Sequence, residues 1–267
     1  GGLMKDLNLR SLRRGDLETV SRIWHASFGD APEDVMQLLT LPGALNGAVC
    51  AEEGGRVCGA MLAFDGLRLG GVRASYLYAL CVAPEARGRG IGRAVYLETV
   101  RQAFSRGAEL ACIHAASTEL ERWYASFSET RILSEAVWER APAAEIQGLT
   151  VRAVPPEEYA ARRGGLEPEL PDIMLRVQEL FSPGSLMLTE ACGRTAPMCA
   201  EKRGSVLYVR ELAGGEERRR LAAGAAFCLG AMEARLYTAG EGETNLMGEF
   251  AHGCRPGGEM FLPVLLD

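Results

Sequence analysis

The stretch of residues 74–92 constrains the fold of this chain more than any other part of it. Residues 74–82 form a short apolar and aromatic run between a Gly70-Gly71 pair and Pro84, a pattern typical of a buried strand. A glycine-rich segment at 87–92 comes next, and a helical pattern of apolar residues begins there. The sequence therefore predicts a strand, a glycine-rich turn and a helix in direct succession.

Such a turn is suited to hold an anion. The first turn of a helix has backbone N–H groups without internal partners, and the helix dipole adds partial positive charge at that end. Glycines have no Cβ, so a phosphate can approach the backbone closely, and arginines add charge nearby. The alternative is a glycine-rich turn with solvated arginines. The glycines are Gly88, Gly90 and Gly92, and the arginines are Arg87, Arg89 and Arg93.

The spacing within this segment is more specific than a lone Gly-x-Gly. Val-x-Pro-x-x-Arg-Gly-x-Gly-Ile-Gly resembles the acetyl-CoA loop of the GNAT acetyltransferases, whose pattern is Gln/Arg-x-x-Gly-x-Gly/Ala. Arg87, Gly90 and Gly92 fill the three fixed positions of that pattern. The segment is neither a Walker A loop nor a Rossmann Gly-x-Gly-x-x-Gly turn.

The resemblance implies acetyl-CoA as the cofactor. Its pyrophosphate would bind at the N-terminus of the helix that begins near Gly90, and its pantetheine arm would bind backbone groups of the preceding strand. The cofactor-binding residues implied in this way are Leu80, Cys81, Val82, Arg87, Gly88, Arg89, Gly90, Ile91, Gly92, Arg93 and Ser117.

Length, composition and charge narrow the class of protein. A chain of 267 residues suggests about two domains. The formal net charge of −6 argues against non-specific binding to nucleic acid or to anionic membranes. The eight cysteines occur singly, without a Cys-x-x-Cys pair, which favours a reducing compartment and no zinc. With no secretory leader and no membrane-length apolar run, we expect a cytoplasmic protein without membrane, nucleic-acid or metal partners.

The elements expected in the first half fit the resemblance. Their order is strand, two helices, three strands, helix, strand, helix, strand, and Asp16 is the expected N-cap of the first helix. This order is similar to the GNAT fold, an α/β (α+β) mixed sheet with helices on both faces, so we expect an acetyl-CoA-binding GNAT domain at 1–141. The expected strands are 7–10, 48–51, 57–64, 74–82, 110–115 and 132–138, and the expected helices are 17–28, 31–41, 91–106 and 118–127.

A second α/β pattern follows the linker-like segment 141–144. Its Gly214-Gly215 turn also precedes a helix, but Glu216 and Glu217 stand where a pyrophosphate would need positive or neutral surroundings. We therefore expect a degenerate GNAT-like domain at 148–267 that binds no CoA and completes the acceptor cleft. The layout is similar to the first two domains of the enhanced-intracellular-survival family of acetyltransferases. The expected strands are 149–154, 186–189, 206–212, 234–238 and 260–265, and the expected helices are 155–162, 173–181 and 216–229.

Amine acetylation needs a held thioester, a deprotonated amine and an acid for the departing thiolate. Tyr124 is the expected acid, because Trp-Tyr-Ala-Ser-Phe-Ser resembles the family's Tyr-x-x-Phe/Leu-Gly-Phe segment, with Ser128 and Glu129 in place of the Gly-Phe pair. The alternative for Tyr124 is packing at an interface. Many GNATs carry a glutamate on or near the strand, but 74–82 has no acidic residue. The resemblance implies the chain's terminal carboxylate, at Asp267, as a helper in deprotonating the amine.

Three other residues have side chains that can take part in acyl or proton transfer. Cys81 is an acyl-carrying nucleophile or, more typically for a cysteine in an apolar strand, a packing residue. His25 and His114 are lone histidines, which usually hydrogen-bond backbone or lie at the surface. We expect an acetyl-CoA-dependent N-acetyltransferase that acts on a small-molecule or peptide amine by direct transfer. The alternative is a non-catalytic CoA-binding sensor or interaction module. No pattern in the sequence indicates an oligomeric state.

Overall fold

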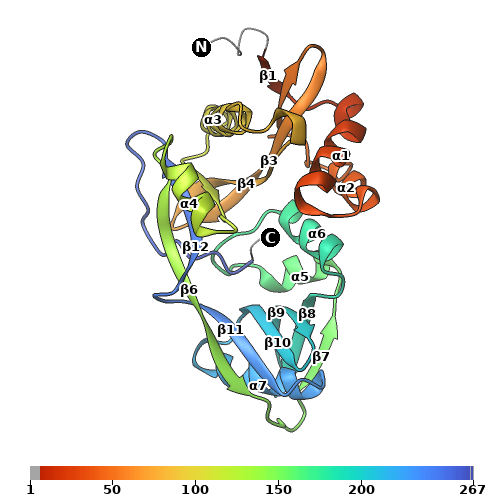
Figure 1. Ribbon diagram of the computed structural model, residues 1–267. Coiled ribbons are helices and arrows are strands. Elements are labelled where there is room, and N and C mark those ends of the chain that lie inside the picture. Colours follow the sequence, from red (N-terminus) through yellow and green to blue (C-terminus); the bar gives the residue numbers. More distant parts are fainter. Residues whose placement is uncertain (1–6, 265, 267) are drawn as a thin grey trace. The chain divides into compact units, whose positions relative to one another are not determined.

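The computed structural model describes residues 7–264 and 266 of the chain (Figure 1). The chain divides into two compact units, and each unit is assembled from two separate segments. Within the described residues, unit 1 comprises 7–131 and 247–259. Unit 2 comprises 132–246 together with 260–264 and 266.

Unit 1 is built around a mixed sheet whose strands lie in the order β1-β2-β3-β4-β5-β12. The parallel pair is β4 with β5, whereas β12 and the remaining neighbours pair antiparallel. The strands are β1 (Leu7–Ser11), β2 (Val49–Glu53), β3 (Arg56–Leu69), β4 (Val72–Val82), β5 (Leu110–Ile113) and β12 (Glu243–Phe250). The helices are η1 (Arg14–Asp16), α1 (Leu17–Phe28), α2 (Pro32–Leu39), η2 (Pro84–Ala86), α3 (Ile91–Ser105) and α4 (Thr118–Ala125).

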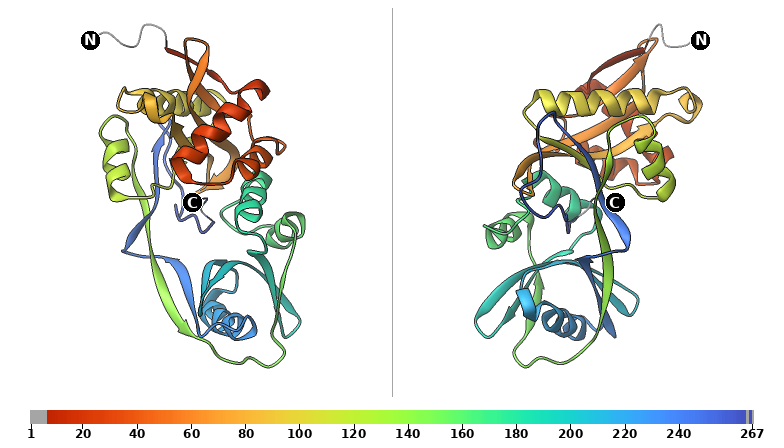
Figure 2. Two further views of the ribbon diagram at one scale, coloured as in Figure 1. Left: turned by 45° about the vertical axis from the view of Figure 1, so that its right-hand side comes forward. Right: turned by 90° about the vertical axis from the view of Figure 1, so that its left-hand side faces the viewer.

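Helices cover both faces of this sheet. Strand β3 is buried continuously from Val57 to Phe64, without the alternation of a strand that has one face in water. The right-hand view of Figure 2 shows α3 running across the strands of unit 1. Helix α1 contributes the fully buried Trp24, whose indole Nε1 donates to Asp30 Oδ2 at 2.7 Å. Unit 1 therefore has the helices on both faces of its sheet that the predicted fold requires.

Unit 2 has strands in the order β6-β11-β10-β9-β8-β7. Its parallel pair is β10 with β11, and β6 pairs antiparallel with β11. The strands are β6 (Arg131–Pro142), β7 (Thr150–Ala153), β8 (Leu186–Ala191), β9 (Arg194–Arg203), β10 (Val206–Leu212) and β11 (Glu233–Ala239). The helices are α5 (Pro156–Arg163), α6 (Asp172–Phe181), η3 (Gly215–Glu217) and α7 (Arg218–Cys228).

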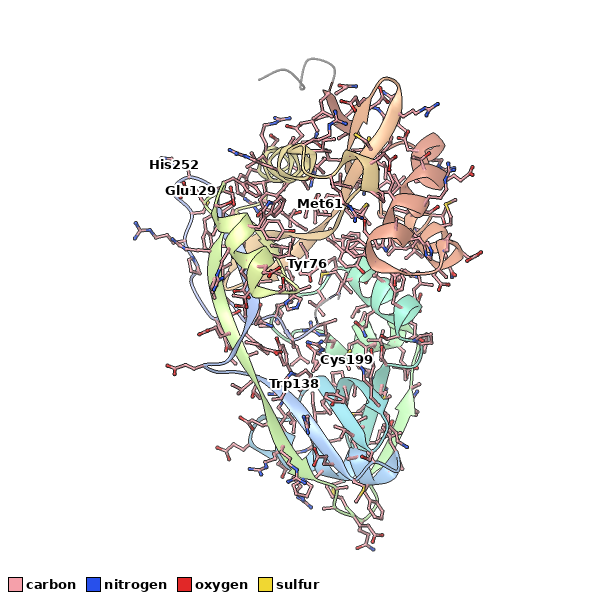
Figure 3. All side chains as sticks on the ribbon, viewed as in Figure 1. Met61, Tyr76, Glu129, Trp138, Cys199 and His252 are labelled. Atoms are coloured by element: carbon pink, nitrogen blue, oxygen red, sulfur yellow. The ribbon has the colours of Figure 1, made fainter. Side chains whose placement is uncertain are left out.

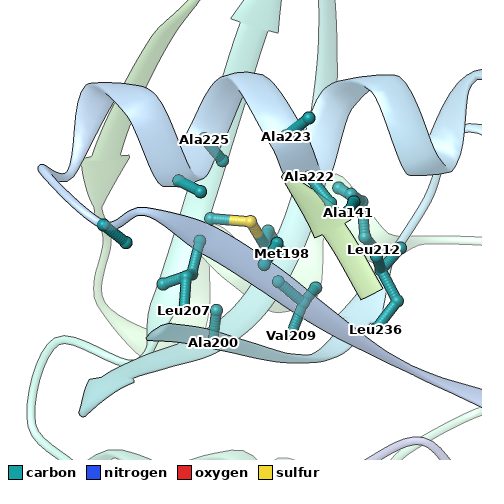
Figure 4. Packing of buried hydrophobic residues seen from close by; sticks show 13 residues of the cluster. Ala141, Met198, Ala200, Leu207, Val209, Leu212, Ala222, Ala223, Ala225 and Leu236 are labelled. Carbon is teal, nitrogen blue, oxygen red and sulfur yellow. The ribbon is translucent and has the colours of Figure 1, made fainter. Parts of the chain in front are cut away.

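The core of unit 2 is formed by small residues of α7 on the sheet (Figure 4). Alanines allow the helix backbone to lie close to strand residues such as Met198 and Val209. Gly224 shows how close the packing is, because a Cβ there would lie 2.6 Å from Ile146 Cδ1. The alanines of α7 therefore form the face of this helix that packs on the sheet of unit 2.

Each unit completes its sheet with a strand from the other half of the sequence. Strand β6 follows α4 of unit 1 along the chain, but it pairs with β11 from Ala136↔Ala239 to Pro142↔Glu233. Residues 247–250 of β12 follow β11 of unit 2, but they pair with β5 from Met247↔Ile113 to Phe250↔Leu110. The two units share one strand arrangement, which confirms the predicted second GNAT-like half. The predicted domains at 1–141 and 148–267 differ from the units because these strands are exchanged.

Two local predictions were wrong. Residues 260–264 form no strand, although Met260 and the consecutive residues 262–264 are buried. The Asn245 side chain takes the place of a strand partner, since Asn245 Oδ1 accepts from Leu262 N at 2.9 Å and Nδ2 donates to Leu262 O at 2.8 Å. Asp16 occupies the N-cap position of α1, but its side chain does not cap that helix. Its carboxylate binds the Arg10 guanidinium instead, at 2.7 Å.

Two strands were missed. Strand β9 contains Pro197 and ends in charged residues, and β12 is mostly polar at its start. Both patterns lack the apolar alternation from which a strand is predicted. Pairing with neighbouring strands makes these segments strands. For example, β9 lies between β8 and β10 and pairs with both.

Asn245→Ala is expected to destabilise the protein. The substitution removes two hydrogen bonds to the Leu262 backbone and one from Ser134 Oγ, all at a fully buried site. We expect a loss of about 1–3 kcal/mol in the free energy of unfolding, because buried backbone groups lose their partners. Urea unfolding measures this loss, with the exposed Asn8→Ala as the control. Equal midpoints for the two variants would contradict the assigned role.

Candidate functional site

The candidate site begins where β4 separates from β5. The ladder between them has three pairs, Ala74↔Leu110, Ser75↔Ala111 and Tyr76↔Cys112, although β4 continues to Val82. Tyr76 lies in the interior of unit 1 (Figure 3). Beyond Tyr76, the edge of β4 that faces away from β3 has no strand partner in the described part of the sheet.

A bulge in β4 accompanies this separation. On the β3 side, Leu62 pairs with Tyr78 and Ala60 pairs with Cys81, so Met61 faces both Ala79 and Leu80. Ala79 has a φ of 56°, in the left-handed region that a residue with a Cβ rarely adopts. A bulge bends its strand and increases the local twist. The bend thus directs the end of β4 away from β5 at the residues predicted to bind the pantetheine arm.

The glycine-rich turn leads from β4 into α3. Gly88 has a φ of 74° and Gly90, the N-cap of α3, has a φ of 82°. A Cβ built at either position would meet no atom within 4 Å, so the space beside these glycines is open. The first helical hydrogen bond runs from Ala94 N to Gly90 O at 3.0 Å, and no side chain caps the helix. The N–H groups before Ala94 therefore remain available to an anion.

The three arginines of the turn have protein partners. Arg87 Nε donates to Val82 O at 3.1 Å, and the Arg89 guanidinium forms an ion pair with Glu53. The Arg89 side chain lowers the pKa of the Glu53 carboxyl. The Arg93 guanidinium lies 5.4 Å from the centre of the Phe127 ring. The turn remains positively charged, but hydrogen bonds to a bound anion would come from its backbone.

Helix α4 packs beside the start of α3. A Cβ at Gly92 would lie 3.5 Å from both Trp123 Cη2 and Val82 Cγ2, so the indole of Trp123 lies next to the first turn of α3. Ser117 caps α4, because its Oγ accepts from Leu120 N at 3.3 Å. The role of Ser117 toward a cofactor stays a prediction. Trp123 was not identified from the sequence, because its contact joins two helices far apart in the chain.

Comparison with known proteins finds a family match for part of unit 1. Residues 17–127, which contain α1, the bulge, the turn and α4, match the acetyltransferase (GNAT) family model. The matched residues lie within unit 1 and make up less than half of the chain. A search of the curated proteins finds no match.

Solved structures extend the likeness to both units. A GCN5-related N-acetyltransferase from Kribbella flavida is 18% identical and has a TM-score of 0.68, over 94% of this chain and 72% of that one. A putative acetyltransferase from Pyrococcus horikoshii is 13% identical, with a TM-score of 0.62, over 100% and 96% of the two chains. Eis1 from Mycobacterium abscessus is 18% identical, with a TM-score of 0.62, over 86% of this chain and 65% of that one. The predicted tandem GNAT layout is confirmed as a fold.

Tyr124 of unit 1 is buried among aromatic rings. Its ring centre lies 4.8 Å from that of Tyr96 and 5.0 Å from that of Trp123, and the residue is 4% exposed. Burial raises the pKa of Tyr124 well above its usual value, so the hydroxyl stays protonated at neutral pH. Ser128 fills the place of the family's glycine and donates to Tyr124 O at 2.8 Å, which fixes the end of α4.

The structure gives different outcomes for the other candidate catalytic residues. Burial raises the pKa of Cys81 to about 12, and the residue is 2% exposed, so Cys81 is a packing thiol and not a nucleophile. His25 Nδ1 contacts Asp30 O at 2.8 Å, near the end of α1. Asp267 lies outside the described residues, and its role stays a prediction. In the described part of the chain, no three metal-ligand side chains gather, and no helix is long and apolar enough to span a membrane.

The structure adds a half-buried carboxylate that sequence reasoning missed. Glu249 of β12 pairs with Ala111 of β5 and accepts from Thr130 Oγ1 at 3.1 Å. Thr130 Oγ1 also contacts the Tyr96 hydroxyl at 2.5 Å, and Ser128 Oγ lies 2.8 Å from Thr130 Oγ1. Only the exchange of β12 brings Glu249 into unit 1, and no local pattern signals that exchange. The cluster ties β12 to α3 and to the end of α4.

The stability of the protein is expected to depend on the ionisation of Glu249. Burial raises the pKa of Glu249 above its usual value of 4.5, so the folded protein binds this proton more readily than the unfolded chain. The stability linked to Glu249 is fully present below pH 4.5 and is lost as pH rises through the raised pKa. Glu249→Gln keeps an acceptor for Thr130, so its Tm relative to the original protein should rise between pH 4 and pH 8.

Glu98→Gln provides the matched control for this titration. A hydrogen bond from Arg101 lowers the pKa of Glu98, so its contribution to stability is present above pH 4.5 and is lost in acid. The Tm of Glu98→Gln relative to the original protein should therefore fall between pH 4 and pH 8. Parallel pH curves for the two variants would contradict the assignment of a raised pKa to Glu249.

Proposed function

We propose that unit 1 binds acetyl-CoA and transfers its acetyl group directly to a small-molecule or peptide amine. GNAT proteins use acetyl-CoA to acetylate amines, and residues 17–127 match the model of that family. The observation that carries the proposal is the sequence of three features along one short stretch. Strand β4 leaves β5 after Tyr76, bulges at Ala79 and runs into the open turn at Gly88 and Gly90.

The turn fits a pyrophosphate. Both glycines have a φ that favours glycine, and the space where their Cβ atoms would lie is open to a ligand. The N–H groups of the first turn of α3 point toward this space and carry the positive end of the helix dipole. An anion of two phosphates is the natural occupant of such a cradle.

The exposed edge of β4 fits the pantetheine arm. That arm is a chain with two amide groups, and an extended chain of amides can pair with a strand edge in the manner of an added strand. Residues Leu80–Val82 supply this edge between the bulge and the turn, and they do so through backbone groups. Leu80 and Val82 are half-buried, whereas the Cys81 side chain points into the core.

Tyr124 is the group that we assign to the leaving thiolate. When acetyl-CoA is bound, it supplies an acetyl group activated as a thioester. The amine nitrogen forms a bond to the acetyl carbon, the carbon–sulfur bond breaks, and the Tyr124 hydroxyl gives its proton to the sulfur. The proton of the amine passes to a base, for which we propose the Asp267 carboxylate or a water chain. The buried Cys81 thiol argues against an acyl-enzyme.

Unit 2 carries the same turn in a form that does not fit CoA. A Cβ at Gly214 would lie 2.8 Å from Leu221 Cδ1, so the protein itself fills the space that is open beside Gly90. Glu216 and Glu217 occupy η3, before α7. We therefore propose one CoA site in each chain, and a role for unit 2 on the side of the acceptor.

A second candidate function is CoA binding without turnover. It is favoured by the absence of an acidic residue from β4 and by Ser128-Glu129 in place of Gly-Phe. A thiol-release assay with acetyl-CoA over a panel of amines separates the two functions. Thiol release with any amine of the panel supports the transferase. Tight CoA binding with no release over a broad panel supports the sensor.

Gly90→Val is expected to weaken CoA binding by roughly 10- to 100-fold, because its side chain fills the cradle and displaces backbone hydrogen bonds to an anion. Calorimetry measures the affinity and also the stoichiometry, which should be one CoA per chain in the original protein. Gly107→Val is the control, since Gly107 also has a positive φ, 96°, with open space around it, but lies beyond the other end of α3. Equal affinities for the two variants, or two sites per chain, would overturn the assignment.

Tyr124→Phe removes only the hydroxyl and should lower kcat by roughly 10²–10⁴, with little change in KM for acetyl-CoA. Tyr208→Phe, in unit 2, is the control and should leave kcat unchanged. Because the pKa of Tyr124 is raised, the activity of the original protein should show no loss up to about pH 9 from ionisation of this group. A near-normal kcat for Tyr124→Phe, measured where chemistry limits the rate, would remove Tyr124 from the mechanism.

A further inference from the structure

Arg87 is the first fixed residue of the glycine-rich turn at 87–92, which we call the cofactor turn. Its side chain contacts other groups of the protein. Its guanidinium makes three hydrogen bonds. Nε donates to Val82 O at 3.1 Å, and Nη2 donates to Ser27 Oγ at 3.2 Å and to Ala26 O at 3.4 Å. One side chain therefore joins the end of β4, the cofactor turn and the last turn of α1.

The end of α1 is a good site for this cation. The last four carbonyls of a helix have no partner within it, and the dipole makes this end negative. Helix α1 ends at Phe28, so Ala26 O is one of these carbonyls. The Ser27 hydroxyl donates to Ile23 O at 2.9 Å, which leaves its oxygen free to accept from Arg87. The contacts of α1 thus account for the charge of Arg87 without a phosphate.

The last turn of α1 is in turn connected to the bulge in β4. The ring centre of Trp24 lies 5.6 Å from that of Tyr78, the residue directly before Ala79, and Phe28 packs its ring edge on Trp24 at 5.6 Å. Phe28 is 49% exposed, so this turn of α1 also borders solvent. A change in the order of α1's last turn would therefore reach both the cofactor turn and the bulge.

We infer that Arg87 is a positioning residue that couples the cofactor turn to the last turn of α1, instead of a direct ligand of the phosphates. The inference rests on the proposed function, because it assumes that CoA binds at the turn. Binding of CoA should then stiffen α1, and loosening α1 should weaken CoA binding. Arginine suits this role because its planar fork reaches two acceptors at once, which a lysine ammonium on its flexible stem does not.

The first test measures CoA affinity by calorimetry on full-length variants. Ser27→Ala removes a hydrogen-bond acceptor of Arg87 that is not itself a proposed phosphate ligand. This variant should bind CoA more weakly by roughly 3- to 10-fold. Arg87→Gln should weaken it by roughly 10- to 100-fold, and Ser27→Ala should cost little more when added to Arg87→Gln. Ser21→Ala is the control, since Ser21 lies on α1 and donates to Glu18 O at 2.9 Å, with no arginine contact.

The second test measures hydrogen exchange of the amides at residues 27–29 with and without CoA. Slower exchange with CoA is expected in the original protein and in Ser21→Ala, and this protection should be lost in Arg87→Gln and Arg87→Lys. A purely structural role would lower Tm without changing this CoA-dependent protection, and a phosphate ligand would be largely rescued by lysine. Either result overturns the inference.

Failure of the coupling is distinguishable from failure of the proposed function. If the original protein binds CoA but Ser27→Ala binds it equally well and the amides at 27–29 do not respond, only the coupling is wrong. If the original protein binds no CoA at millimolar concentration, both the proposed function and the coupling are wrong.

Discussion

The early end of the ladder between β4 and β5 is the constraint on which the candidate site depends. Backbone groups of a parallel pair are normally satisfied by each other, but here the pairing stops at Tyr76↔Cys112 while β4 continues. The left-handed conformation of Ala79 stores backbone strain that the surrounding packing must hold in place. The unpaired edge of β4, the bulge at Ala79 and the open turn therefore form one continuous structural feature. The candidate site requires all three of them.

Local patterns predicted the parts of this feature and long-range pairing decided the rest. The glycine spacing at 88–92 fixed the turn, because a positive φ and an open approach demand glycine at Gly88 and Gly90. The bulge could not be predicted, because Ala79 lies in an apolar run and its residue type does not indicate a left-handed conformation. Glu249 and the Asn245 clamp could not be found either, because each depends on strand pairing between distant segments.

Unit 2 has the strand order of unit 1 but a different turn before its helix α7. Leu221 fills the space beside Gly214 in this turn, and buried charged groups lie near the end of β10. Arg163 and Glu211 form a buried ion pair there, at 2.6 Å, and the Tyr159 hydroxyl donates to the same carboxylate at 2.7 Å. Removing one partner of such a pair leaves an uncompensated charge, which typically costs about 3–5 kcal/mol. These groups are fixed to one another and are not available to a ligand.

The exchange of β6 and β12 between the units has a consequence during synthesis. Strand β5 leaves the ribosome long before Met247–Phe250, its antiparallel partner, has been made. The newly made first half therefore carries an exposed sheet edge, which is a template for pairing with other chains. Contacts between such distant segments also slow folding. The sheet of unit 1 therefore cannot be completed until Met247–Phe250 have been synthesised.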